Sequence, residues 1–259
     1  MGVVETEAGR IGVTERGSGG VPLVFLHGVG SDKSVWRPQL EHFGESRRTL
    51  AFDYPGYGES AFVPDATRDD FAAAIIAGMD ALAIERAHVC GLSLGGVVAI
   101  AMHAIAPDRC ASLILADTFA VHPEGSALYE RSVAASHNLG MRGLAEARVD
   151  ALLAAPIDPG VRAEVIETMS RIDPEAYALG AAAVWLADQC DRAAAIACPT
   201  LILCGTEDRI TPPALSEELK QHIPHAALVE IAGAGHLSNL ERPAIFNRVM
   251  AAFLAGLDG

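Results

Sequence analysis

The sequence predicts an α/β fold in which a mostly parallel central sheet is flanked by helices on both faces. Short apolar runs recur along the 259 residues, and segments of helical character separate them. This alternation is typical of parallel strands that are covered on both sides. Glycine-rich or polar loops follow several of the runs directly. In such sheets, ligands bind beyond the carboxyl ends of the strands, so we expect these loops to form the functional site.

Eight strands are expected. The first two, residues 3–7 and 11–15, read as a hairpin around Ala8-Gly9-Arg10. The other six strands are residues 22–26, 48–52, 87–90, 111–116, 198–204 and 227–231.

A helix over residues 67–82 is indicated by Thr67 as N-cap, by acidic residues in the first turn and by an apolar stripe. Further helices are expected over residues 96–105, 213–222 and 243–254. Residues 118–191 show helical segments without intervening strands and predict a helical lid inserted into the sheet domain. The core would then comprise residues 1–117 and 192–259.

The most informative stretch is Gly91-Leu92-Ser93-Leu94-Gly95, which lies between an expected strand and an expected helix. A serine at such a sharp turn takes a strained conformation, and small residues are needed two positions before and after it. The turn lifts the hydroxyl clear of the sheet edge. Ser93 is therefore the candidate nucleophile.

A neutral serine needs an imidazole to accept its proton and a carboxylate to orient that imidazole. His236 follows the last strand in a loop of small residues, and it is the candidate base. Asp208 and Asp117 both follow strands, and sheet hydrolases of this kind can use either place for the acid. We favour Asp208, because the loop Gly205-x-x-Asp208-x-x-x-Pro212 is the commoner setting, and we expect Glu207 to face outward.

The developing oxyanion needs backbone N–H donors. The N–H of Leu94 lies at the start of the serine helix, where unsatisfied donors and the positive end of the helix dipole coincide. The second donor in a serine hydrolase comes from the loop after an earlier strand, and Val29 in His27-Gly28-Val29-Gly30 is the candidate. We expect His27 to brace this loop and Asp53 to bond local backbone amides, rather than to act in catalysis.

Charge and composition exclude several classes of partner and cofactor. The formal net charge of -14 disfavours nucleic acid and anionic membrane partners. The first 16 residues show neither a signal peptide nor a membrane span, which predicts a cytoplasmic protein. Five scattered cysteines read as reduced thiols. No metal-binding or nucleotide-binding motif is present in the sequence, so we expect neither a metal nor a cofactor.

Together, His27-Gly28-x-Gly30, Gly91-x-Ser93-x-Gly95-Gly96, Gly205-x-x-Asp208 and Gly235-His236 resemble the α/β-hydrolase superfamily over essentially the whole chain. The order nucleophile, acid, base also matches that family. Within it, the chain is most similar to 3-oxoadipate enol-lactonases, through residues 91–96, 140–148, 173–177 and 236–241. It departs from them at residues 53–58, where those lactonases more often carry Arg-Gly-His-Gly after the aspartate.

The resemblance implies a serine hydrolase that cleaves a carboxylic ester or lactone through an acyl-enzyme, with a small molecule as its only expected partner. A C–C hydrolase or perhydrolase on the same fold, or a binding-only receptor, remains an alternative. Expected substrate contacts are Trp36, Met141, Arg142 and Trp185. For a substrate that carries a carboxylate, Arg142 and Arg148 are the candidate partners, since bidentate arginine suits a planar carboxylate.

Overall fold

The computed structural model describes residues 2–7 and 9–257, and its centre is an eight-stranded sheet in the order β1-β2-β4-β3-β5-β6-β7-β8. The pairs β1/β2 and β2/β4 are antiparallel, and the remaining pairs are parallel. The predicted α/β-hydrolase fold with a mostly parallel sheet is therefore confirmed. The strands are β1 (Gly2–Thr6), β2 (Gly9–Arg16), β3 (Leu23–Leu26), β4 (Thr49–Phe52), β5 (Ala87–Leu92), β6 (Cys110–Ala116), β7 (Thr200–Gly205) and β8 (Ala227–Ile231).

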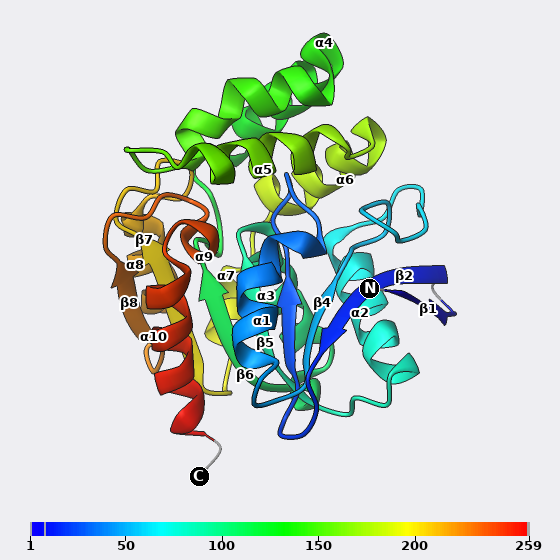
Figure 1. Cartoon of the computed structure of the whole chain (residues 1–259), viewed down its shortest axis with the longest axis vertical. Coiled ribbons are helices and arrows are strands. Elements are labelled where there is room, and N and C mark those ends of the chain that lie inside the picture. The colour runs from blue at the N-terminus through cyan, green and yellow to red at the C-terminus, as the bar shows by residue number, and fades with distance from the viewer. Residues whose placement is uncertain (1, 8, 258–259) are drawn as a thin grey trace.

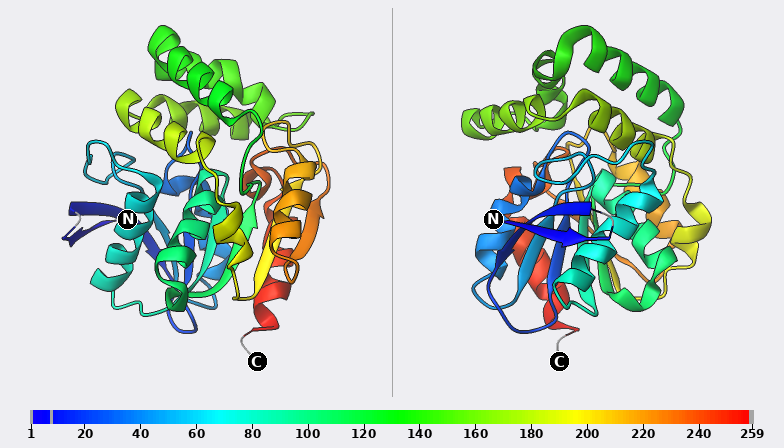
Figure 2. Two further views of the ribbon diagram at one scale, coloured as in Figure 1. Left: turned by 180° about the vertical axis from the view of Figure 1, so that it is seen from behind. Right: turned by 90° about the vertical axis from the view of Figure 1, so that its right-hand side faces the viewer.

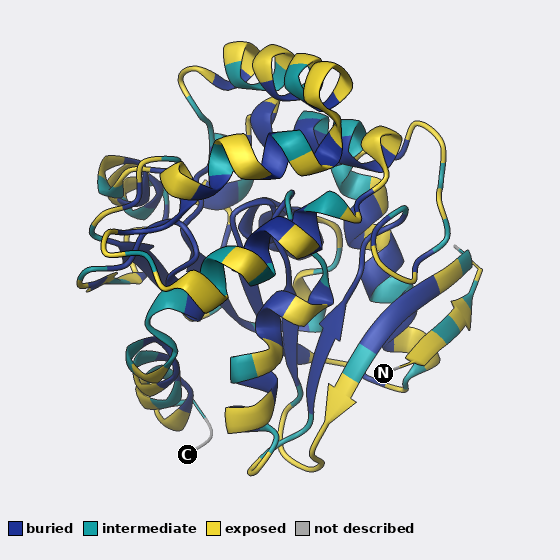
Figure 3. Ribbon diagram, turned by 45° about the horizontal axis from the view of Figure 1, so that its top comes forward, coloured by how far each residue is buried: buried dark blue, intermediate teal, exposed yellow. Residues whose placement is uncertain are grey.

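The first hairpin differs from expectation in one detail. Gly9 and Arg10 belong to β2 itself, while Ala8, in the expected turn, lies outside the described residues. Figure 3 shows buried residues concentrated in the central strands and exposed ones on β1 at the edge. All four residues of β3 are buried, as the continuous apolar run predicted.

The helices cover both faces of the sheet. In Figure 1, α1 and α10 lie on the face toward the viewer, and the reverse view in Figure 2 shows α2, α3 and α8 on the other face. The helices are α1 (Arg37–Phe43), α2 (Arg68–Ala81), α3 (Leu94–Ile105), α4 (Gly125–Leu152), α5 (Pro159–Ser170), α6 (Pro174–Trp185), α7 (Cys190–Ala194), α8 (Pro213–His222), α9 (Ser238–Glu241) and α10 (Pro243–Ala255), with 3₁₀ turns η1 (Lys33–Trp36) and η2 (Pro107–Arg109).

Helix α2 begins with the N-cap that the sequence predicted. The Thr67 hydroxyl accepts a hydrogen bond from the Asp70 N–H, and the Asp70 carboxylate accepts one from the Thr67 N–H. This reciprocal capping box satisfies two N–H groups that the helix leaves unpaired. By contrast, η1 and α1 have no counterpart in the sequence-based prediction. Their start is marked by Asp32, whose side chain accepts a hydrogen bond from the Ser34 N–H.

Helices α4, α5 and α6 form a layer above the carboxyl ends of the strands (Figure 1), which we call the upper layer. Gly140 interrupts α4 with a non-helical φ of 67°. An isolated antiparallel bridge joins Val121 to Asp188 at the base of this layer, where no strand pairing was expected. The boundaries of the lid at residues 118 and 191 stay a prediction.

All five cysteines are free thiols, and Cys90, Cys110 and Cys204 are buried. Within the described ranges, no helix combines the length and the apolar character needed to cross a membrane.

Candidate active site

Ser93 sits at a tight turn between β5 and α3. Its φ of 54° and ψ of -114° put it in a conformation that L-residues rarely adopt. The neighbouring glycines are required by space, because a Cβ at Gly91 would lie 2.1 Å from the Gly95 carbonyl oxygen and a Cβ at Gly95 would lie 2.0 Å from the Leu26 carbonyl oxygen. The strand–turn–helix geometry expected from the motif is present.

His236 and Asp208 form a buried, hydrogen-bonded pair. The His236 Nδ1 atom lies 2.8 Å from Asp208 Oδ2. The other carboxylate oxygen of Asp208 accepts hydrogen bonds from the Ile210 and Thr211 N–H groups at 2.7 Å and 2.9 Å. Glu207 is exposed, as expected. Asp208 is thus fixed by its own loop and aims one oxygen at the imidazole.

The charges of this pair support each other. Burial alone would raise the pKa of Asp208, but the charge and hydrogen bond of His236, with hydrogen bonds from Thr211, lower it below its ordinary value. Burial would likewise lower the pKa of His236, yet Asp208 raises it, with a further contribution from Asp117. The carboxylate therefore favours the protonated imidazole, as a proton-accepting base requires.

Asp117, the alternative acid, has different partners. It is fully buried at the end of β6, and its carboxyl accepts hydrogen bonds from the Gly205 N–H at 2.7 Å and from the Ser238 hydroxyl at 2.5 Å. Burial, followed by the charge of Asp208, raises the pKa of Asp117 to about 8. A carboxyl that is mainly protonated at neutral pH is poorly suited to stabilise an imidazolium.

Val29 and Leu94, the expected oxyanion donors, flank Ser93. Val29 lines the same pocket as Ser93 and His236, and Leu94 is the first residue of α3. Across residues 2–7 and 9–257, neither N–H group donates a hydrogen bond to a protein acceptor. Both are thus available to an external oxygen.

The residues around the Val29 loop brace it. His27 is buried against Tyr54 and Tyr57, and its Nδ1 lies 2.8 Å from the Gly28 carbonyl oxygen. Asp53 accepts a local hydrogen bond from the Glu59 N–H at 3.0 Å, as expected, but it also holds Lys33 through the Lys33 N–H at 2.8 Å and the ammonium at 2.5 Å. Both side chains therefore act on loop structure.

The pocket beside Ser93 is small, with a cavity volume of about 40 Å³. Its walls are mostly apolar, and the upper layer contributes Arg148, Leu152, Glu164, Val165, Thr168, Met169 and Trp185. Trp185, an expected substrate contact, is among them, and its ring stacks on Phe119 with centroids 5.9 Å apart. Arg148 also lines the pocket and donates a hydrogen bond to the Tyr177 hydroxyl at 2.6 Å.

Three expected substrate contacts lie elsewhere. Trp36 is fully buried in the core, stacked on Phe25 with centroids 4.8 Å apart, so its apolar surface is used in packing. Met141 is buried in the hydrophobic core and is not part of the pocket wall. Arg142 points to solvent and pairs with Glu146 and Glu167 at 3.7 Å and 3.1 Å. The structure therefore does not bring these three residues to the wall of the pocket beside Ser93, and their role as substrate contacts stays a prediction.

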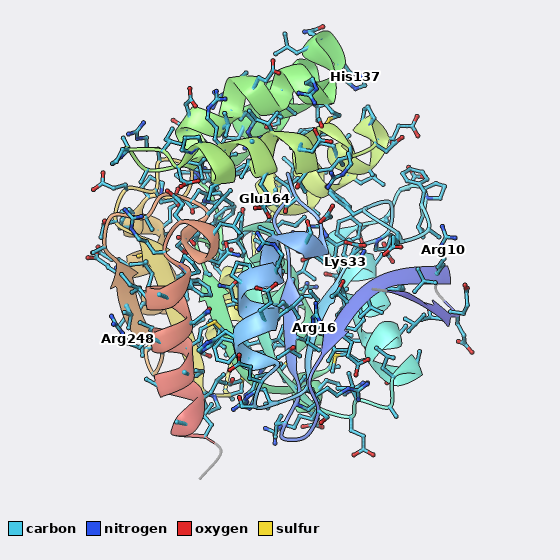
Figure 4. The ribbon with its side chains drawn as sticks, viewed as in Figure 1. Arg10, Arg16, Lys33, His137, Glu164 and Arg248 are labelled. Atoms are coloured by element: carbon cyan, nitrogen blue, oxygen red, sulfur yellow. The ribbon has the colours of Figure 1, made fainter. Side chains whose placement is uncertain are left out.

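Glu164, a charged residue of the pocket wall, was not expected from the sequence. It lies on α5 where the upper layer faces the core (Figure 4), and its carboxylate pairs with Arg37 on α1 at 3.2 Å. Its position depends on how α5 packs over the sheet, which no local pattern encodes. Among the described side chains, no group of three or more His, Cys, Asp or Glu residues has an arrangement that could hold a metal ion.

Comparison with known proteins agrees with this geometry. The model of the alpha/beta hydrolase family matches residues 23–249. A 3-oxoadipate enol-lactonase of Acinetobacter baylyi is 27% identical over 239 residues, covering 91% of this chain and 89% of the relative. The crystal structure of the enol-lactonase from Burkholderia xenovorans superposes with a TM-score of 0.92 at 29% identity, covering 98% of this chain and 100% of that one.

A second similar solved structure is that of an esterase. The thermophilic esterase from Thermogutta terrifontis, with malate bound, superposes with a TM-score of 0.91 at 29% identity, covering 100% of this chain and 99% of that one. Since the family model spans most of the sequence and the fold agrees throughout, the chain belongs to the alpha/beta hydrolase family.

Proposed function

We propose that this hydrolase cleaves a carboxylic ester or lactone through an acyl-enzyme formed on Ser93, with His236 as base and Asp208 as acid. The observation that carries the proposal is the buried Asp208–His236 pair, whose imidazole lines the same pocket as a serine held at a strained turn. The enol-lactonase and esterase relatives support the same chemistry.

In the first half of the reaction, the Ser93 oxygen attacks the substrate carbonyl carbon while the free ring nitrogen of His236 takes the hydroxyl proton. Asp208 holds the opposite nitrogen and stabilises the imidazolium. The carbonyl oxygen gains negative charge and is held by the Val29 and Leu94 N–H groups, the latter at the positive end of α3. Collapse breaks the carbon–oxygen bond, and His236 returns its proton to the departing oxygen.

In the second half, water attacks the acyl-enzyme and His236 again accepts a proton. The bond between the acyl carbon and the Ser93 oxygen then breaks, His236 returns its proton to that oxygen, and the acid product is released. For a lactone, the departing alcohol or enol oxygen stays attached to the acyl group, so both products are one molecule. We further propose that residues 118–191 act as a lid, since the upper layer supplies much of the apolar wall that excludes water.

The triad is tested by hydrolysis of p-nitrophenyl acetate. We expect Ser93→Ala to abolish turnover and Asp208→Asn to lower kcat about ten-thousand-fold, as when a triad aspartate is neutralised. Ser126→Ala, at an exposed serine on α4, is the matched control and should behave as wild type. Absence of Ser93-dependent turnover on any short ester or lactone would indicate a binding protein. Full activity in Asp208→Asn would show that another acid serves His236.

We propose that the preferred substrate is an acidic lactone, of the enol-lactone type, whose free carboxylate is bound by Arg148. Arg148 is the guanidinium that lines the pocket, and its bond to Tyr177 fixes its direction. A guanidinium binds a planar carboxylate through two parallel hydrogen bonds. The malate-bound esterase supports this choice, because malate is itself a dicarboxylate.

The Arg148 assignment is tested by comparing an acidic enol-lactone with a neutral aliphatic lactone. We expect Arg148→Ala to lower kcat/KM for the acidic substrate about tenfold to a hundredfold, the range for one lost charged hydrogen bond, and to affect the neutral lactone little. Arg142→Ala is the matched control, since it removes a solvent-facing arginine from the same helix. Equal losses on both substrates would mean that Arg148 supports the pocket without binding carboxylate.

A further inference from the structure

The end of β6 joins the segments that carry all three proposed catalytic residues. The Ser93 N–H donates to the Ala116 carbonyl oxygen at 2.9 Å, and the Thr118 hydroxyl donates to the Ser93 carbonyl oxygen at 2.8 Å. Residues 116 and 118 therefore hold the turn that presents the nucleophile. We call residues 116–118 the triad junction.

Asp117, the middle residue of the junction, makes the other two connections. One carboxyl oxygen accepts the N–H of Gly205, the last residue of β7, three positions before Asp208. The other oxygen accepts the hydroxyl of Ser238, two positions after His236. Asp117 has a φ of 47°, an unfavourable value for a non-glycine residue, and it has no exposed surface. The strain is retained where the carboxyl links the loops of the proposed acid and base.

We propose that Asp117 is a positioning residue: its carboxyl holds the Asp208 loop and the His236 loop in register. This inference rests on the function proposed above, and it gives Asp117 a role distinct from that of the triad acid. The neutral and the ionised carboxyl can both accept the Gly205 N–H. The contact with Ser238 can form in either state too, since a hydroxyl can donate or accept.

The groups that face Asp117 explain why its charge matters. Asp208 and His236 act on it from the two loops, and the buried thiols of Cys90 and Cys204 lie on the strands at either side of β6. Burial and the charge of Asp208 keep the proton on Asp117 up to a pKa of about 8. Once ionised, Asp117 raises the pKa of His236. The two groups therefore titrate as an interacting pair.

The first test measures kcat, KM and the pH profile of ester hydrolysis in wild type, Asp117→Asn, Asp117→Ala and Ser238→Ala. Asparagine can accept from Gly205 and donate to Ser238, so Asp117→Asn should stay within about threefold of the wild-type kcat at pH 7. Asp117→Ala removes both connections and should lower kcat about tenfold to a hundredfold with little change in KM. Ser238→Ala should lower kcat by less than Asp117→Ala.

The pH profile separates this role from simple structural support. The rate constant kcat/KM rises with pH as His236 loses its proton. In Asp117→Asn the upper part of the rise should move to lower pH and the rise should follow a single ionisation, because the carboxyl that raises the pKa of His236 once it is ionised is gone. Asp108→Asn is the matched control, an exposed carboxyl just before β6. A profile identical to wild type in Asp117→Asn would overturn the charge effect, and an unchanged kcat in Asp117→Ala would overturn the positioning role.

A second readout does not depend on activity. In the unfolded chain the pKa of an aspartate is about 4. In the folded chain the pKa of Asp117 is raised to about 8. The stabilising effect of this difference is complete below the lower value and is lost as the pH rises through the higher one. The melting temperature of wild type should therefore fall relative to that of Asp117→Asn between pH 5 and pH 9. If the difference in melting temperature between the two proteins does not change with pH, Asp117 does not keep its proton in the folded chain.

The kinetic and the melting-temperature measurements also distinguish failure of the proposed function from failure of the inference about Asp117. If wild type has no Ser93-dependent turnover, the proposed function and the positioning role fall together, while the melting temperatures still report the buried carboxyl. If turnover depends on Ser93 and Asp208 but Asp117→Ala equals wild type, the proposed function stands and only the inference about Asp117 fails.

Discussion

Arg142 and Arg148 lie on the same helix, yet only Arg148 faces the pocket. Six residues at about 100° each give about 600°, so the two side chains point about 120° apart around the helix and cannot share a face. Arg142 pairs with Glu146 and Glu167 in solvent, where such pairs contribute little stability. Arg148 is half-buried and anchored on Tyr177. At the scale of residues, the direction in which each arginine side chain points from the helix decides which of the two can reach a molecule in the pocket.

The residues that could be identified from sequence are those whose geometry is local. Gly91, Ser93 and Gly95 are separated by fixed spacings, and contact between backbone atoms excludes any side chain at the two glycines. The choice between Asp208 and Asp117 also rested on a loop pattern. The place of Trp36 in the core could not be predicted, because an aromatic residue packs equally well into a core or a pocket, and only tertiary contacts such as that with Phe25 distinguish the two.

At the scale of elements, the end of α4 is tied to the loop of His236. The His236 N–H donates to the Leu152 carbonyl oxygen at 2.9 Å. Glu241 on α9 accepts hydrogen bonds from the Ala154 N–H at 2.6 Å and from the Gly235 N–H at 2.9 Å. Burial raises the pKa of Glu241, while these hydrogen bonds oppose the shift. The upper layer and the proposed base are thus positioned together.

Removing the Glu241 carboxylate should therefore affect both stability and turnover. We expect Glu241→Ala to lower the free energy of unfolding by about 1–3 kcal/mol, because two N–H groups lose their acceptor, and to lower kcat for ester hydrolysis. Denaturant unfolding and steady-state kinetics measure the two effects. Glu146→Ala, an exposed glutamate on α4, serves as control. A loss of stability at unchanged kcat would mean that the connection does not reach His236.

Elements were predictable where an apolar run or a cap marks them. All eight strands and helix α2 were expected. The hairpin pattern indicated β1 and β2, apolar runs indicated the other strands, and Thr67 begins the capping box of α2. Helix α1 has only seven residues, too few for a recognisable periodicity, and α9 has four. The upper layer was expected as helical, but its packing over the sheet, which brings Glu164 to the pocket, depends on contacts remote in sequence.

At the scale of the whole molecule, the upper layer and the core are joined by few charges. Arg37 pairs with Glu164 at 3.2 Å, and Arg171 pairs with Asp32 at 3.6 Å. Both arginine side chains are more than half exposed, so water and salt screen these pairs. We therefore expect salt to act on this protein mainly through its overall charge, and little through release of the upper layer.

A formal net charge of -14 should repel an acidic substrate at long range. The screening length falls from about 30 Å at 0.01 M salt to about 8 Å at 0.15 M. Since Arg148 is half-buried, its short-range attraction is screened less than this long-range repulsion. Between these salt concentrations, kcat/KM should rise for an acidic enol-lactone and stay constant for a neutral lactone. In Arg148→Ala, kcat/KM for the acidic enol-lactone should still rise with salt, but its value should be lower than that of wild type at each salt concentration. A change with the neutral lactone would point to movement of the upper layer, and a fall with the acidic one would show that positive charge near the pocket outweighs the net charge.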